Sequence, residues 1–455
     1  MAHRNRRARV QYPSFGRLTN LGGRPSAMER AGQNQISLVL ASIIALLLSV
    51  RLPYVSWLTP GGVIAMAMAP VVLSVFLKQA GAVAILVGSL FTFSAGLVLA
   101  DWSIAEGSTF SQRVAILEGG QLVGMMLIVV AACWCIRILG MTRFIIIWAV
   151  GYSISQALYS ERFSEDIWKF GYALPATCLL LLIADRLRRR NLTLIIVLTI
   201  GTLSALASYR SWIMVVVIAF FLVAYIQWRQ GANDRPISTL GAAIVIVGIG
   251  FSIGYSVLNL AISGLLGQST QERTVEQIDD GGNIFIGGRP EWGAAMDLFH
   301  YNPSGYGLGI MPTTLDKAIA LNGLAVNPAL REQSGVAQYF RLGLIEFHSN
   351  LWNYWSHYGV IGVAFIVLLA ILALKALIAA ATNRTDFPSL TVAVIILGFI
   401  WDLAFSGTNI ASQGVAIAVA MSAVNAEREL AGRTEGFLSK RPTPGRHFIA
   451  RQSVE

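Results

Sequence analysis

Apolar stretches long enough to cross a bilayer recur along almost the whole chain. A helix needs about 20 apolar residues to span the hydrocarbon core, and the sequence offers about twelve such stretches. They cover residues 34–52, 60–77, 80–100, 119–137, 143–159, 170–185, 192–208, 211–228, 238–260, 350–374, 388–405 and 409–425. Several contain Gly or Pro, which suits helices and not the short alternating strands of a membrane β-barrel. We therefore predict an all-α polytopic membrane protein.

The distribution of charge predicts how these spans are oriented. The 455-residue chain is 55% hydrophobic and 13% charged, a composition that excludes an ordinary soluble domain. Lys and Arg gather in alternate loops and in both tails, with one cluster at Arg186–Arg190. By the positive-inside rule that side is cytoplasmic, and both termini lie there. The net charge of +10 then reports topology and contact with anionic lipids. Nucleic acid is not an expected partner, because the tails lack interleaved aromatic residues.

The predicted organisation has five parts. Residues 1–33 form a basic, disordered cytoplasmic tail, residues 34–260 hold the first nine spans, and residues 261–349 form a large extracytoplasmic loop. Residues 350–425 hold the last three spans, and residues 426–455 form a second basic cytoplasmic tail. The large loop is the only predicted outer segment long enough to build a site, and its pattern predicts short helices. A second outer loop, from Asp101 to Glu118, is a candidate for an interfacial helix.

The segment Glu346–Asn350 places a histidine where the large loop enters the tenth predicted span. Imidazole titrates near neutral pH, so His348 is a candidate general base that takes a proton from an acceptor hydroxyl. The alternative is a hydrogen-bonded structural imidazole. His357 lies nine residues further on, about 180° around an ideal helix. We therefore predict that His357 is a core residue that faces away from His348.

Fixed cations are the second requirement for chemistry at the outer face. The activated donors there are chiefly polyprenyl phosphates and diphosphates, and guanidinium groups bind phosphate oxygens in a bidentate manner. Arg210, in a tight turn between two spans, and Arg289, in the large loop, are the leading candidates. The alternatives are a snorkelling interfacial Arg210 and a solvated Arg289. The adjacent carboxylates Asp279 and Asp280 fit a solvated turn better than a metal site, so we predict neither metal nor cofactor.

Three groups of residues in the second half share their order and spacing with a known signature. They are Gly288-Arg289-Pro290-Glu291-Trp292, then Asn302-Pro303-Ser304-Gly305-Tyr306-Gly307-Leu308-Gly309, and then His348-Ser349-Asn350 with Tyr358-Gly359-Val360-Ile361-Gly362. Together they resemble the O-antigen ligase and O-antigen polymerase superfamily, over about residues 190–370. Two positions depart from its pattern. Ser349 stands where the family often has Asn, and Tyr209 separates Ser208 from Arg210 where the family usually has Ser-Arg.

The resemblance implies a GT-C-like glycosyltransferase of the bacterial cytoplasmic membrane, with its active site on the extracytoplasmic side. It would move a glycan from an undecaprenyl-diphosphate carrier to a saccharide or lipid-glycan acceptor, without metal or nucleotide. By matching position, His348 is the catalytic residue, and Arg289 and Arg210 bind the donor diphosphate. Possible additional site residues are Arg341, Arg273 and Trp292. The signature does not separate a ligase from a polymerase. A transporter or flippase of lipid-linked sugars is the rival class.

Overall fold

Helices make up the regular secondary structure that the computed structural model describes. The described residues are 27–50, 52, 55, 57–160, 162–187, 189–207, 209–232, 239–265, 267–268, 271–272, 274–275, 278, 289–324, 345–382 and 388–439. Within these ranges there is no β-strand, only the isolated bridges Leu52 with Val55 and Phe110 with Ile310. The predicted all-α class is confirmed for this part of the chain.

The helices follow one another with short connections in the first half of the chain. They are α1 (Ala27–Leu47), α2 (Pro60–Ala67), α3 (Ala69–Phe76), α4 (Ala82–Ala105), α5 (Gln112–Leu139), α6 (Met141–Tyr159), the π-helix η1 (Trp168–Tyr172), α7 (Ala173–Leu187), α8 (Arg190–Leu206), α9 (Arg210–Ala232) and α10 (Thr239–Ile262). The second half contributes α13 (Pro290–Tyr301), α14 (Thr314–Gly323), α17 (Asn350–Thr382), α18 (Ser389–Phe405) and α19 (Ile410–Ser439).

Five of the described helices are long and apolar enough to cross a membrane, judged by length and composition. They are Ala82–Ala105, Gln112–Leu139, Trp168–Leu187, Arg210–Trp228 and Asn350–Thr382. Shorter apolar helices cover Gln35–Leu47, Asn191–Leu206, Ser389–Phe405 and Ile410–Ala426. These helices indicate a membrane protein. The count of twelve spans, with the large loop between the ninth and tenth, stays a prediction.

The predicted span over residues 60–77 is divided between two helices. Helices α2 and α3 have eight residues each and meet at Met68. Pro70 lies in the first turn of α3, where its missing N–H prevents it from continuing the hydrogen-bond ladder of α2. At about 1.5 Å per residue, neither helix alone reaches across a hydrocarbon core of about 30 Å.

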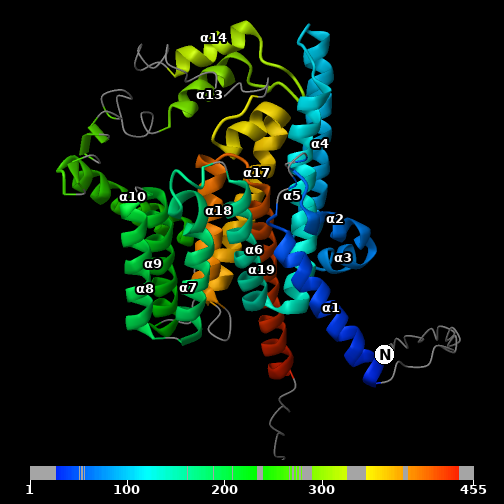
Figure 1. Ribbon diagram of the computed structural model, residues 1–455, viewed down its shortest axis with the longest axis vertical. Coiled ribbons are helices and arrows are strands. Elements are labelled where there is room, and N and C mark those ends of the chain that lie inside the picture. The colour runs from blue at the N-terminus through cyan, green and yellow to red at the C-terminus, as the bar shows by residue number, and fades with distance from the viewer. Residues whose placement is uncertain are drawn as a thin grey trace, which may run out of the picture.

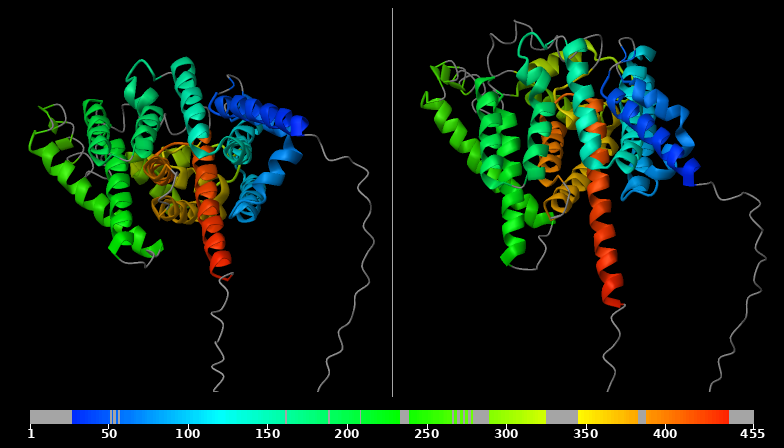
Figure 2. Two further views of the ribbon diagram at one scale, coloured as in Figure 1. Left: turned by 90° about the horizontal axis from the view of Figure 1, so that it is seen from below. Right: turned by 60° about the horizontal axis from the view of Figure 1, so that its bottom comes forward.

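Helices α17, α18 and α19 form the middle of the bundle (Figure 2). On one side α17 packs against α4 and α19 against α5, and on the other side α18 packs against α7 and α9. One continuous apolar core joins these helices and extends from Ala41 in α1 to Val424 in α19. The C-terminal helices therefore hold the two halves of the bundle together.

Helices α13 and α14 lie at one end of the bundle, opposite the start of α1 and the end of α19 (Figure 1). They pack closely where Gly293 meets Gly323. With the start of α17 they enclose a second, smaller core that includes Leu298, Phe347 and Trp355. This end of the bundle carries α13 and the start of α17, and with them Arg289, Trp292 and His348, whereas the α7–α8 turn with its exposed arginines lies at the other end.

Helix α17, which covers the predicted span over residues 350–374, changes direction at Gly359. Gly359 has φ 63° and ψ −151°. A side chain at this position would collide with the carbonyl oxygen of Ser304, and one at Gly305 would collide with the carbonyl oxygen of Trp355. Glycine is required at both positions, because the two backbones touch and φ is positive. The first part of α17 therefore ends against the glycine-rich turn.

The helices at the two ends of the chain extend beyond the predicted spans. Helix α1 begins at Ala27, inside the predicted tail 1–33, and α19 continues to Ser439, inside the predicted tail 426–455. The predicted bounds followed the apolar side chains, whereas a helix that has already started adds one hydrogen bond per residue and can continue into polar sequence. The first proline after the start of α19 is Pro442.

Asp185, near the end of α7, caps the start of α18. Its carboxylate accepts hydrogen bonds from the N–H groups of Leu390 at 3.2 Å and Thr391 at 3.0 Å, and from the Thr391 hydroxyl at 2.7 Å.

We expect Asp185→Ala to reduce the free energy of unfolding by about 2 kcal/mol, measured as a lower unfolding temperature in detergent. The control is Asp101→Ala, which removes an exposed carboxylate from α4. Equal unfolding temperatures for the two variants would contradict the capping role.

Candidate functional site

The segment that leads into α17 alternates between buried and exposed residues. Ile345 and Phe347 are 1% and 0% exposed, whereas Glu346 and His348 are exposed. In an extended chain, successive side chains point to opposite sides. The buried positions therefore fix the side on which His348 lies, at the end of the bundle that carries α13 and α14.

Asn350, the first residue of α17, joins the His348 segment to the end of α18. Its Nδ2 donates to the carbonyl oxygens of Asp402 at 2.7 Å and Ser406 at 3.1 Å, and its Oδ1 accepts the Thr408 hydroxyl at 3.1 Å. Asn350 is 1% exposed, so these bonds are shielded from water. They hold His348, two residues earlier, near the α18–α19 connection.

Arg289 precedes α13 and faces the same end of α18. Its Nη1 donates to Glu291 Oε1 at 3.3 Å, and its guanidinium carbon lies 5.9 Å from the ring centroid of Phe405. Its side chain is 31% exposed, and the guanidinium has no other protein acceptor among the described residues. Arg289 therefore places a partly exposed cation beside the end of α18.

An aromatic cluster lies between Arg289 and the His348 segment. The ring of Trp292 stacks on Phe405 at 5.5 Å and meets Trp352 edge-on at 5.6 Å, measured between centroids. Phe299 and Trp355 complete the cluster. The indole N–H groups of Trp292 and Trp352 are buried and have no acceptor in the described part of the chain. Buried indole N–H groups usually have a partner, and the described residues supply none for these two.

Arg210 begins α9, close to the same end of the bundle. Its Nη1 donates to the Thr274 hydroxyl at 3.1 Å, which links α9 to the predicted outer loop. The preceding residue, Tyr209, has a raised pKa because it is buried and because the carboxylate of Asp402 lies nearby. The positive charge of Arg289 acts in the opposite direction and lowers this pKa. Tyr209, Asp402 and Arg289 are therefore within electrostatic reach of one another, and Arg210 follows directly in the chain.

The other candidate residues are divided between the cluster and the undescribed part of the chain. Trp292 lies in the aromatic cluster, as given above. Arg273, Arg341 and the Asp279-Asp280 pair lie outside the described residues. Among the described residues, no group of three or more His, Cys, Asp or Glu side chains has the geometry to hold a metal ion.

The glycine-rich turn, Gly305–Gly309, serves packing and does not form a phosphate cradle. The N–H groups of Tyr306 and Gly307 donate to the Ser356 carbonyl, at 2.8 and 3.1 Å, and that of Leu308 donates to Gly96 at 3.0 Å. Burial and the Asp316 carboxylate raise the pKa of Tyr306, whose hydroxyl donates to Asp316 at 3.1 Å. The backbone donors are thus used within the protein.

A buried acid and a buried histidine lie beneath this turn and were not predicted as a pair. Glu118 and His357 are 2% and 7% exposed, with Glu118 Oε1 3.1 Å from His357 Nε2. The sequence placed Glu118 at the end of an outer loop with an interfacial helix. That expectation is wrong, because α4 continues to Ala105 and α5 already begins at Gln112. A lone acid just before one apolar stretch and a histidine inside another were the available signal.

His357 is buried, as predicted, but it does not face away from the His348 segment. His348 precedes α17 and is not helical, so the angle between the two residues on an ideal helix does not apply. Instead, Nε2 of His357 lies 3.0 Å from the carbonyl oxygen of Ile345.

Comparison of the sequence with protein-family models gives no match, and comparison with curated proteins gives none either.

Proposed function

We propose that this protein is a membrane glycosyltransferase of the O-antigen ligase or polymerase type. It would transfer or polymerise a glycan from an undecaprenyl-diphosphate donor onto an acceptor hydroxyl during cell-surface polysaccharide synthesis. One observation carries the proposal: Arg289 and the His348 segment border a single aromatic cluster at one end of a bundle of apolar helices. A cation, an imidazole and aromatic rings suit a diphosphate, a hydroxyl and a sugar respectively.

The chemistry assigned to these residues is a displacement at the anomeric carbon of the donor sugar. The acceptor oxygen forms a bond to that carbon while the bond from the carbon to the diphosphate oxygen breaks. The acceptor proton passes to the imidazole of His348. Arg289, with Arg210 as a second cation, stabilises the negative charge that develops on the leaving diphosphate. This electrostatic interaction is stronger in the transition state than in the ground state, so it lowers the barrier.

The proposed location is the extracytoplasmic face of the bacterial cytoplasmic membrane. Support comes from the positive-inside pattern: exposed Arg186 and Arg189 lie at the end of the bundle opposite α13 and α14. Both termini would then be cytoplasmic. The polyprenyl chain would lie among membrane lipids against the apolar helices, and its diphosphate would lie beside Arg289.

A transporter or flippase of lipid-linked sugars is the alternative function. Transporters commonly place ionisable groups and broken helices near the middle of the membrane. The buried Glu118–His357 pair and the break in α17 at Gly359 are the features that favour this alternative. Both lie near the beginnings of α5 and α17, at the end that carries α13 and α14, which favours a site at the membrane surface.

The direct test uses the purified protein in lipid vesicles with a synthetic polyprenyl-diphosphate sugar and a saccharide acceptor. We expect release of the polyprenyl diphosphate together with an elongated saccharide, measured by chromatography and mass spectrometry. Vesicles without protein provide the control. Movement of the intact donor to the other leaflet, with no diphosphate released, would contradict the proposed function and support the transporter alternative.

A further inference from the structure

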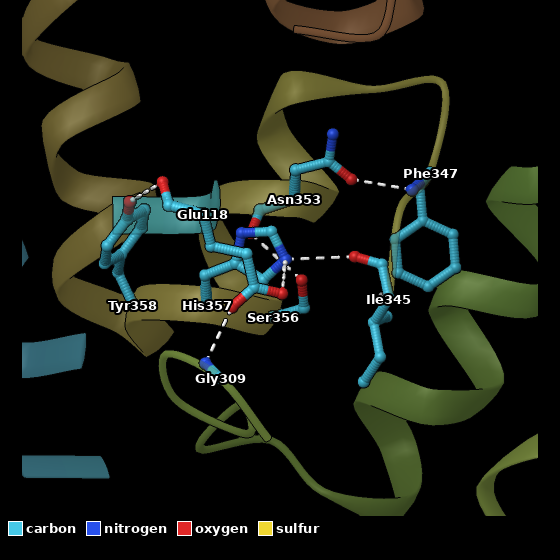
Figure 3. Close-up of polar contacts among 8 residues, drawn as sticks. All are labelled: Glu118, Gly309, Ile345, Phe347, Asn353, Ser356, His357 and Tyr358. Carbon is cyan, nitrogen blue, oxygen red and sulfur yellow. Dashed lines mark hydrogen bonds and ion pairs between the residues drawn. The ribbon is translucent and has the colours of Figure 1, made fainter. Parts of the chain in front are cut away.

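The buried pair Glu118–His357 connects three parts of the molecule that lie far apart in the sequence (Figure 3). Glu118 belongs to α5 and His357 to the first part of α17. Glu118 Oε2 accepts the N–H of Gly309 in the glycine-rich turn at 2.8 Å. His357 Nε2 lies 3.0 Å from the carbonyl oxygen of Ile345, in the segment that carries His348. The pair therefore touches both loops that border the candidate site.

The neighbours of His357 fix the position of one proton on its ring. Nε2 lies within hydrogen-bond distance of a carboxylate oxygen and a carbonyl oxygen, and both are acceptors. Nε2 must therefore carry the hydrogen, which it shares between Glu118 and Ile345. Glu118 in turn accepts through both oxygens, since Gly309 donates to the other one.

The second tether on the same segment is Asn353. Its Oδ1 accepts the N–H of Phe347 at 2.7 Å, and Asn353 is 3% exposed. With His357 bound to Ile345, two residues of α17 hold the backbone of this segment on either side of Glu346. These two bonds fix the backbone at positions three and one residues before His348, and so limit the directions in which His348 can face.

We propose that Glu118 and His357 are positioning residues that hold the imidazole of His348 toward its substrate through the Ile345 carbonyl. This inference rests on the proposed function and adds to it a residue pair that does not contact the substrate. A buried, hydrogen-bonded carboxyl–imidazole pair is a costly way to join two helices, and apolar side chains of similar volume would serve as well or better. The hydrogen bonds from this pair to the backbone of both loops are what apolar side chains could not provide.

The test compares His357→Phe, which has no N–H donor, with His357→Gln, whose amide restores one. We expect His357→Phe to reduce kcat for polyprenyl diphosphate release by about 100-fold, while KM for the donor changes little because Arg289 is untouched. His357→Gln should recover most of the lost kcat. Tyr354→Phe is the matched control, since it alters a buried α17 residue whose hydroxyl, among the described residues, meets the Met125 sulfur at 4.0 Å.

A second measurement does not depend on activity. The cysteines Cys133, Cys135 and Cys178 are buried, so a nitroxide attached to Glu346→Cys reports the mobility of the His348 segment by electron paramagnetic resonance. We expect a mobile label with His357→Phe and an immobile one with His357→Gln or Tyr354→Phe. If His357→Phe fails to fold, Glu118→Gln takes its place. The glutamine side chain has one oxygen and one NH₂ group, so its NH₂ group must face either the Gly309 N–H or the His357 Nε2–H, and that hydrogen bond is lost.

The two measurements separate failure of this inference from failure of the proposed function. An immobile label in folded His357→Phe, or an unchanged kcat, would overturn the positioning role. If the unaltered protein shows no transfer at all, the proposed function fails, and label mobility alone then decides whether the pair holds the segment.

Discussion

Replacing His348 with alanine should lower the rate of polyprenyl diphosphate release by about 10²- to 10⁴-fold, the range that a positioned general base contributes. The variant should still fold, because His348 is exposed and lies outside both apolar cores. The measurement is the initial rate in vesicles at saturating donor and acceptor. Binding of the donor should persist, since the proposed diphosphate contacts come from Arg289 and Arg210.

Glu346→Gln is the matched control for this substitution. Glu346 is exposed on the same segment, two residues before His348, and on the same side of the alternating chain. Its replacement should leave the rate within about twofold of the unaltered protein, as expected for a surface position that takes no part in the chemistry. A folded His348→Ala protein that keeps a tenth of the rate or more would remove the proposed role of His348.

The helical architecture was predictable because a long apolar stretch has few other stable forms in a membrane. Each predicted span contains helical residues, and the large loop contains the short helices α13 and α14. The break at Met68 had a local signal in Pro70. The break at Gly359 had only the glycine itself as a signal, because its position depends on contact with Ser304, more than fifty residues earlier.

The candidate site was predictable in its residue types and less so in its contacts. His348 lies where the loop enters α17, as its position in the sequence indicates, whereas the bond from His357 to Ile345 depends on how the segment folds back. The start of α5 offers a similar case. Ser111 caps this helix by accepting the Val114 N–H at 3.4 Å, which brings Glu118 into the helix although the apolar stretch begins only at Gly119.

Reversing the charge at Arg289 should also have a large effect, in this case on how the protein uses its polyprenyl-diphosphate donor. With Arg289→Glu, we expect kcat/KM for the polyprenyl-diphosphate donor to fall by about 100-fold or more, since charge-assisted hydrogen bonds contribute about 1.5–3 kcal/mol each and the new carboxylate repels the diphosphate. Most of the loss should lie in KM for the donor, with KM for the acceptor unchanged. The measurement is the initial rate across a series of donor concentrations.

Three further variants separate diphosphate binding from general effects of charge. Arg162→Glu reverses an exposed arginine whose side chain is 59% accessible and paired with Glu165, and it should leave donor kinetics unchanged. Arg289→Gln removes the charge without adding a carboxylate beside Asp402, so it distinguishes loss of binding from local repulsion. Arg289→Lys keeps the charge but loses the bidentate geometry, and we expect an intermediate value of kcat/KM. Unchanged donor kinetics in folded Arg289→Glu would mean that the diphosphate binds elsewhere, and Arg289 would then serve its contacts within the protein, with Glu291, Phe405 and the nearby Asp402.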